Sequence, residues 1–79
     1  VTGSDSLSTA NSLNNLALLA SSIGDYAQAE RYFQQTLAVR RKALRGDHPL
    51  IATTLNHLGL LYVSQDRLRE AESLLKQAL

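Results

Sequence analysis

The sequence predicts an all-α fold, an α-solenoid fragment of two helix-turn-helix units with four antiparallel helices. Residues 47–79 repeat residues 5–37 at an offset of 42, with twelve identities and no gap. Ordinary residue frequencies would give roughly two or three such identities by chance. Within each copy, apolar residues recur at spacings of three and four, which is the period of one helical face. Since one such unit cannot bury its apolar face alone, repeats of this length are expected to stack.

Length and composition suit one small domain without disulfides. The chain has 79 residues, no cysteine, 44% apolar residues and a formal charge of +1. This charge balance gives no reason to expect binding to nucleic acid or membrane. No apolar run approaches the ~20 residues of a membrane span, and no signal peptide is recognised. We expect a soluble, cytoplasmic protein. Because the chain starts at Val1 and stops at Leu79 in mid-pattern, we expect a fragment of a longer array, with a complete short protein as the alternative.

The first helix of the first unit is expected at about residues 7–22, after a polar lead-in over residues 1–4. Asp5 or Ser6 can cap it. Leu18 and Leu19 lie off its apolar stripe, so this helix is expected to contact more than one neighbour. The stripe consists of Leu13, Leu16, Ala17, Ala20 and Ile23.

The second helix is expected at about residues 26–44, completing a unit over residues 5–46. Gly24 permits a left-handed turn, and Asp25 can cap the helix with Gln28 as its capping-box partner. Gly46 is expected to end the helix in the left-handed region. The residues expected to face inward are Tyr26, Ala29, Phe33, Leu37 and Leu44. The last turns carry the cations Arg40, Arg41, Lys42 and Arg45, which complement the carbonyl end of the helix; a nucleic-acid contact is the less favoured reading.

The second unit, residues 47–79, repeats this plan. Pro49 suits the first helical position, and Asp47 or His48 can cap a helix at about residues 49–64. Asp66 stands in the turn where Gly24 stood. The last helix, at about residues 67–79, is shorter than its counterpart. The apolar and small residues of the unit are Leu55, Leu58, Gly59, Tyr62, Leu68, Ala71, Leu74, Leu75, Ala78 and Leu79.

The series Leu55, Leu58, Gly59, Tyr62, Ala71, Leu75 and Ala78 resembles the tetratricopeptide repeat pattern. The first unit places Leu13, Leu16, Ala17, Ala20, Gly24, Tyr26, Ala29, Phe33 and Thr36 at the same positions. The 42-residue period, with the linker 47–49, is similar to the kinesin-light-chain subtype. Ala20 and Thr36 depart from the pattern. The resemblance implies a right-handed superhelix and a protein-binding role.

In that family the first helix of each unit lines a concave groove. The resemblance therefore places Asn11, Asn14, Asn15, Leu18, Ser21 and Ser22 in the groove from the first unit. From the second unit it places Thr53, Asn56, His57, Leu60, Val63 and Ser64 there. Asparagine both donates and accepts hydrogen bonds, which suits a peptide backbone, although bonds to neighbouring helices or water are the alternative. His57 is expected to line the groove or bond a neighbour. Neither groove helix contains Lys or Arg, so a clamp for a carboxylate terminus is not expected.

An enzyme, a metal site or a cofactor is not expected. His48 and His57 are nine residues apart, without cysteine or a carboxylate at ligand spacing. No nucleophile motif or phosphate loop is recognised. The carboxylates Asp25, Glu30, Glu70 and Glu72 are expected in water or paired with Arg31 or Arg69.

Two functions follow as hypotheses. The first is a scaffold that binds a protein or peptide through the neutral, Asn-rich concave face. The second is a structural or assembly element that packs on other copies or domains. Solenoids usually need about three repeats and polar ends. The apolar residues Leu74, Leu75, Ala78 and Leu79 at one end, and Leu19 at the other, therefore predict self-association by stacking or by helix exchange at 46–49.

Overall fold

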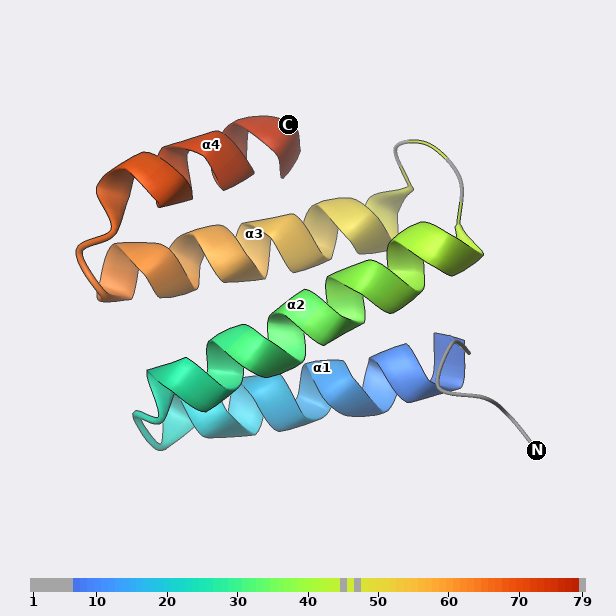
Figure 1. The fold of residues 1–79 in the computed structure, drawn as a ribbon, viewed down its shortest axis with the longest axis horizontal. Coiled ribbons are helices and arrows are strands. Elements are labelled where there is room, and N and C mark those ends of the chain that lie inside the picture. Colours follow the sequence, from blue (N-terminus) through green and yellow to red (C-terminus); the bar gives the residue numbers. More distant parts are fainter. Residues whose placement is uncertain (1–6, 45, 47, 79) are drawn as a thin grey trace.

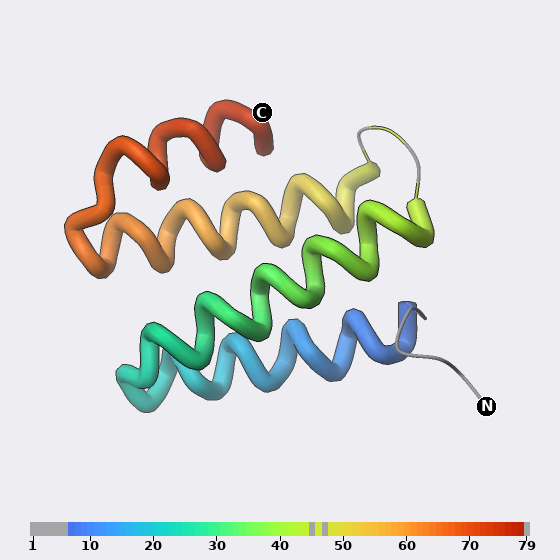
Figure 2. Tube along the Cα trace, viewed as in Figure 1, coloured from blue at the N-terminus to red at the C-terminus, as the bar shows by residue number. Residues whose placement is uncertain are grey.

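A computed structural model describes residues 7–44, 46 and 48–78. They form four helices and no strand: α1 (Leu7–Ser22), α2 (Tyr26–Ala43), α3 (Pro49–Ser64) and α4 (Leu68–Ala78) (Figure 1). Each helix runs antiparallel to the one before it (Figure 2), and the Cα extents are 39 × 28 × 13 Å. The all-α prediction is confirmed, and the helices begin and end within one or two residues of the expected ranges. The division into units at residue 47 stays a prediction. None of the helices described is long and apolar enough to cross a membrane.

The helix ends follow the local signals. The Asp25 side chain accepts a hydrogen bond from the Gln28 amide at 3.3 Å, which caps α2. Pro49 occupies the first turn of α3, and His48 Nδ1 accepts from the Leu50 amide at 3.1 Å. His48 is therefore the cap of α3, and its alternative Asp47 lies outside the described residues. Asp5 and Ser6, the candidate caps of α1, also lie outside them.

Three turn residues have left-handed backbones. Gly24 has a φ of +85° and Gly46 a φ of +66°, as the sequence predicts. Asp66, the counterpart of Gly24, has a φ of +61°. Asp is one of the few side chains that tolerate this region. The same turn geometry is thus built with different residues in the two hairpins.

The core combines small residues on the facing helices with a few large side chains. Phe33, Leu58, Leu61 and Tyr62 are buried together with Ala17, Ala20, Ala29 and Ala71, and Tyr32, Leu37 and Leu74 pack against them. At Gly59 an added Cβ would lie 2.7 Å from Cγ of Leu75, so α3 and α4 approach too closely there for a side chain. Small residues are needed where the backbones come together.

Some residues predicted to face inward do not. Tyr26 is exposed, and Ile23 and Leu16 on the α1 stripe are also exposed. On α2 the buried positions are instead Ala29, Phe33, Thr36, Val39 and Arg40. The burial of Arg40 determines much of the polar structure described below.

Candidate partner-binding surfaces

A cleft of about 200 Å³ lies between α1 and α3. It brings together five residues that the sequence predicts for the groove, with Phe33 of α2 and Leu61 of α3 between them. We call it the α1–α3 cleft; its lining is Leu18 and Ser21 of α1, Phe33 of α2, and His57, Leu60, Leu61 and Ser64 of α3. Equivalent positions in the two hairpins thus share one surface.

The α1–α3 cleft is apolar and uncharged at its rim. Leu18 is 43% exposed and Leu60 is 53% exposed, so both offer contact area to a partner. Ser64 Oγ donates to the Leu60 carbonyl at 3.2 Å, which leaves its lone pairs available as acceptors. The volume of the α1–α3 cleft is below the range of about 300–1,000 Å³ that is typical of small-molecule pockets. It suits a single side chain of a longer ligand.

His57 gives the α1–α3 cleft its one titratable group. Its ring centroid lies 5.4 Å from that of Phe33, and Nδ1 is buried without a hydrogen-bond partner among the described residues. Burial lowers the pKa of His57, and the positive charge of Arg40 lowers it further. The imidazole is therefore neutral at neutral pH. The cleft then presents no formal charge to a partner.

The remaining predicted residues lie elsewhere. Thr53 and Asn56 line a separate hollow of about 360 Å³ with Ala52, Leu75 and Ala78, between α3 and α4. Thr53 Oγ1 also donates to the Pro49 carbonyl at 2.9 Å. Asn15, Ser22 and Val63 are exposed and line neither hollow. The predicted groove is therefore divided into two surfaces.

Two asparagines of α1, Asn11 and Asn14, do not line either hollow. Asn11 Oδ1 accepts from Nη2 of Arg40 at 3.3 Å. Asn14 is half-buried, and its Oδ1 is buried without a partner in the described part of the chain. For Asn11 the alternative reading, a bond to a neighbouring helix, matches the structure.

Arg40 is a buried cation rather than one member of a solvated basic cluster. Its residue exposure is 3%. Nη1 donates to Thr54 Oγ1 at 2.7 Å and to the Leu50 carbonyl at 3.3 Å, and burial lowers its pKa. Arg40 thus joins α2 to α3 and, through Asn11, to α1. The continuation of the stripe Ala29, Phe33, Thr36 to residue 40 at helical spacing is the signal that sequence analysis missed.

This burial weakens the nucleic-acid reading, because Arg40 cannot reach a phosphate. Its Nη1 and Nη2 groups already donate hydrogen bonds within the protein, and its Nε is buried without a partner among the described residues. Phosphate binding requires solvent-facing cations.

A second polar cluster joins the two hairpins, and we call it the clasp: Glu30 of α2, Tyr62 of α3 and Arg67 in the α3–α4 turn. Arg67 Nη1 lies 2.6 Å from Glu30 Oε1, and Tyr62 donates to Glu30 Oε2 at 2.9 Å. The guanidinium of Arg67 stacks 4.1 Å from the centroid of the Tyr62 ring. Burial raises the pKa of Tyr62, and its bond to Glu30 adds to this. The clasp is thus a partly buried, charge-assisted contact between units.

The clasp corrects the expected ion pairs. Glu30 and Glu70 both pair with Arg67, not with Arg31 or Arg69. The hydrogen bond from Arg67 lowers the pKa of Glu70. Arg67 follows a left-handed turn residue, and from there its long side chain reaches back to α2. Helical spacing gives no signal for the contact of Arg67 with Glu30, whereas Arg67 and Glu70 are only three residues apart.

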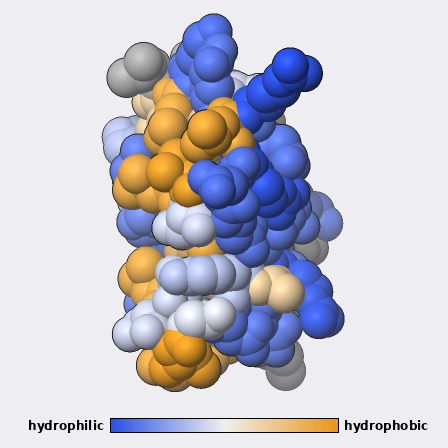
Figure 3. All heavy atoms as spheres, turned by 90° about the vertical axis from the view of Figure 1, so that its left-hand side faces the viewer, coloured by the Kyte–Doolittle hydropathy of each residue, from blue (hydrophilic) through white to orange (hydrophobic). Residues whose placement is uncertain are grey.

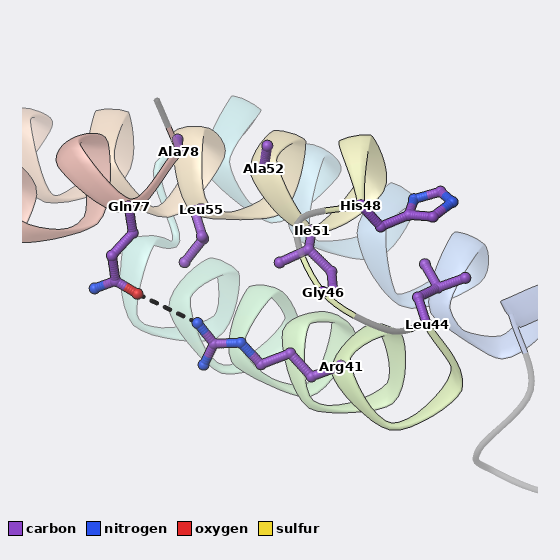
Figure 4. Close-up of a pocket in the computed structure, with 9 residues that line it drawn as sticks. All are labelled: Arg41, Leu44, Gly46, His48, Ile51, Ala52, Leu55, Gln77 and Ala78. Atoms are coloured by element: carbon purple, nitrogen blue, oxygen red, sulfur yellow. Dashed lines mark hydrogen bonds between the residues drawn. The ribbon is translucent and has the colours of Figure 1, made fainter.

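Another cleft, of about 420 Å³, contains none of the predicted binding residues (Figure 4). Arg41 of α2 and Gln77 of α4 point toward one another across it, with Nη2 donating to Oε1 at 3.3 Å. The other lining residues are Leu44, Gly46, His48, Ile51, Ala52, Leu55 and Ala78. Among the described residues, no group of three or more His, Cys, Asp or Glu could hold a metal ion.

Comparison with known proteins gives a family match over most of the chain. A family model described as tetratricopeptide repeat matches residues 8–79. Nephrocystin-3 of Homo sapiens is 40% identical over 77 residues, which is 96% of this chain and 6% of that protein. Nephrocystin-3 of Xenopus tropicalis is 39% identical over 71 residues, or 90% of this chain and 5% of that protein. The chain therefore spans about one twentieth of the length of these relatives.

Proposed function

The chain belongs to the tetratricopeptide repeat family, and from this premise we propose that it is a protein-interaction scaffold. It binds an extended peptide or a partner domain through the α1–α3 cleft. The observation that supports this most is the exposure of Leu18 and Leu60 at the rim of one cleft. Apolar side chains left in water beside polar groups mark interaction sites. The 42-residue period further supports the kinesin-light-chain subtype.

The chemistry of the cleft favours a particular kind of ligand. Its lining holds no Lys, Arg, Asp or Glu, and burial and Arg40 keep His57 neutral. The ligand should therefore insert an apolar side chain, and its backbone groups can bond Ser21 and Ser64 at the rim. A ligand that depends on its charge, such as a terminal carboxylate, gains nothing here.

We expect a peptide-display selection on the wild-type chain to recover peptides that bind at the α1–α3 cleft. Leu18→Glu combined with Leu60→Glu should reduce binding of the recovered peptides at least tenfold, since charges then replace the apolar contact. Isothermal titration with synthetic versions of these peptides measures the change. Leu68→Glu is the matched control, because Leu68 is 59% exposed but does not line the cleft. Peptides that bind the double variant as well as the wild type would contradict the proposal.

A second candidate function is an assembly element that stacks on other repeat units. It is favoured by Leu19 of α1, which is 61% exposed. Self-association of this chain through its ends belongs to this candidate. This assembly function differs from the scaffold function because it requires no extended peptide as a ligand.

A further inference from the structure

The outer face of α1 is built for a helix that the described structure does not contain. Leu16 and Leu19 repeat Leu58 and Leu61 of α3 at the 42-residue offset. Leu58 and Leu61 are 2% and 3% exposed, whereas Leu16 and Leu19 are 44% and 61% exposed. In Figure 3 a small hydrophobic patch lies at the lower end of the molecule, on the side of α1. The difference arises because α2 covers Leu58 and Leu61 of α3, whereas no described helix covers Leu16 and Leu19 of α1.

The contact of α2 with α3 serves as a template for what would cover that face. In this template, Glu30 of the covering helix meets Tyr62 and Arg67 of the covered hairpin. At the 42-residue offset, Tyr62 corresponds to Ala20 and Arg67 to Asp25. The outer face of α1 therefore keeps the leucines of the interface but replaces the aromatic hydroxyl and the cation with a methyl group and a carboxylate.

A second copy of this chain would dock poorly by the same geometry. Its covering helix would be α4, in which Glu72 corresponds to Glu30. Glu72 is held by Lys76 at 3.1 Å, just as Glu30 accepts from Gln34 at 3.2 Å, so the two glutamates have similar local settings. Docking α4 on α1 would bring Glu72 toward Asp25. Two carboxylates that approach at an interface oppose binding and give specificity.

We propose that the outer face of α1 docks an α2-like helix of another repeat unit, and that Asp25 selects one with Lys or Arg at the position equivalent to Glu30. The proposal deepens the second candidate function and rests on it. The leucines supply the apolar contact, while the residue facing Asp25 decides between partners. Identical copies stacked head to tail are the disfavoured pairing.

The chain itself can be converted into the preferred partner. Glu72→Lys places a cation on α4 that would face Asp25 of a second copy. We expect this variant to associate with itself at least about fivefold more tightly than the wild type at low salt. The gain should shrink with added salt, while weak association of the wild type should strengthen as repulsion is screened. Sedimentation equilibrium over a range of concentrations measures both. The positive net charge of the chain rises in the variant. General repulsion between copies would therefore weaken association, not cause the expected increase.

Two further variants locate the contact. Asp25→Asn removes the charge but can still cap α2, and in the Glu72→Lys background it should abolish the gain. Leu19→Gln in that background should abolish association. Ser73→Lys, on a neighbouring exposed position of α4, is the control that should behave as the wild type. Circular dichroism checks that each variant is folded.

The outcomes separate the inference from the assembly function. If wild type and Glu72→Lys associate equally well and both depend on Leu19, charge selection is wrong and the assembly function stands. If Asp25→Asn leaves the association of Glu72→Lys unchanged, charge selection by Asp25 is also wrong. If neither protein associates, or if Leu19→Gln has no effect, the docking face itself is wrong.

Discussion

Arg40 carries a charge into the interior and balances it with neutral oxygen atoms rather than a carboxylate. Thr54, Leu50 and Asn11 provide these acceptors from two other helices. A planar guanidinium with several donors can bond both neighbours at once, which an ammonium group cannot do in the same way. The residue therefore fixes the spacing of α1, α2 and α3. Its role is structural even though it lies in a run of surface cations.

We expect Arg40→Ala to lower the free energy of unfolding by about 2 kcal/mol, since it removes buried hydrogen bonds and leaves a cavity. Arg41→Ala is the matched control. Arg41 is exposed and makes one long bond to Gln77, so its loss should change stability by no more than about 0.5 kcal/mol. Urea unfolding followed by circular dichroism measures both. If both variants lose the same free energy of unfolding, the buried hydrogen bonds of Arg40 do not stabilise the fold.

His57 should make stability depend on pH. Burial, and then the charge of Arg40, lower its pKa in the folded state below the ordinary value of 6.5. As pH falls through about 6.5, the unfolded chain takes up a proton that the folded chain does not, so stability is full above this pH and is lost below it. The loss continues, at up to about 1.4 kcal/mol per pH unit, until the folded-state pKa is reached.

Replacing His57 with the residue of the first unit isolates this effect. We expect His57→Asn, which copies Asn15, to remove the difference in stability between pH 7 and pH 5 that His57 causes. Thermal unfolding at several pH values measures it. If the stability of the wild type and of the variant changes with pH in the same way, His57 binds protons equally in the folded and unfolded states.

At the scale of the helices, α3 and α4 differ sharply in burial. The buried residues of α3 are Ile51, Thr54, Leu55, Leu58, Gly59, Leu61 and Tyr62, whereas Ala71 is the buried residue among those described in α4. Segments with few buried contacts open at lower free energy than the core. Native-state hydrogen exchange should therefore find the amides of α4 at least about tenfold less protected than those of α3. Uniform protection would mean that the α3–α4 hairpin opens as one unit.

The helices could be predicted from local signals, because the apolar period and the caps act within a few residues of one another. Leu18 and Leu60 could be placed on one surface for a similar reason, since the repeat assigns them equivalent positions. The burial of Arg40 has a signal in the helical stripe that leads to it, but the partners of Arg40 and Arg67 could not be predicted, because a long side chain gives no local sign of the partner it reaches. For Asn11 the sequence left open a bond to a neighbouring helix, and its acceptor is used by Arg40.

At the scale of the whole molecule, the clasp and Arg40 are the partly or fully buried polar links between the two hairpins, and Arg41 adds an exposed bond to Gln77. Glu30 and Glu72 form a natural pair of test and control, because they occupy equivalent positions. Glu30→Gln should lower the free energy of unfolding by about 1 kcal/mol, since it weakens the bonds to Tyr62 and Arg67. Glu72→Gln loses an exposed contact to Lys76 and should cost no more than a few tenths of a kcal/mol. Thermal unfolding of both variants measures the difference, and equal costs would show that the clasp contributes nothing.

The clasp also gives the two units a fixed order. Tetratricopeptide units look interchangeable, because their leucines recur at the same places. A chain with these two units permuted would set Glu72 against Ala20 and Asp25, so it would keep the leucines of the junction and lose the bonds that Glu30 makes to Tyr62 and Arg67. The two units therefore cannot exchange places without loss. The contacts of Glu30 with the α3–α4 hairpin determine which unit comes first in the array.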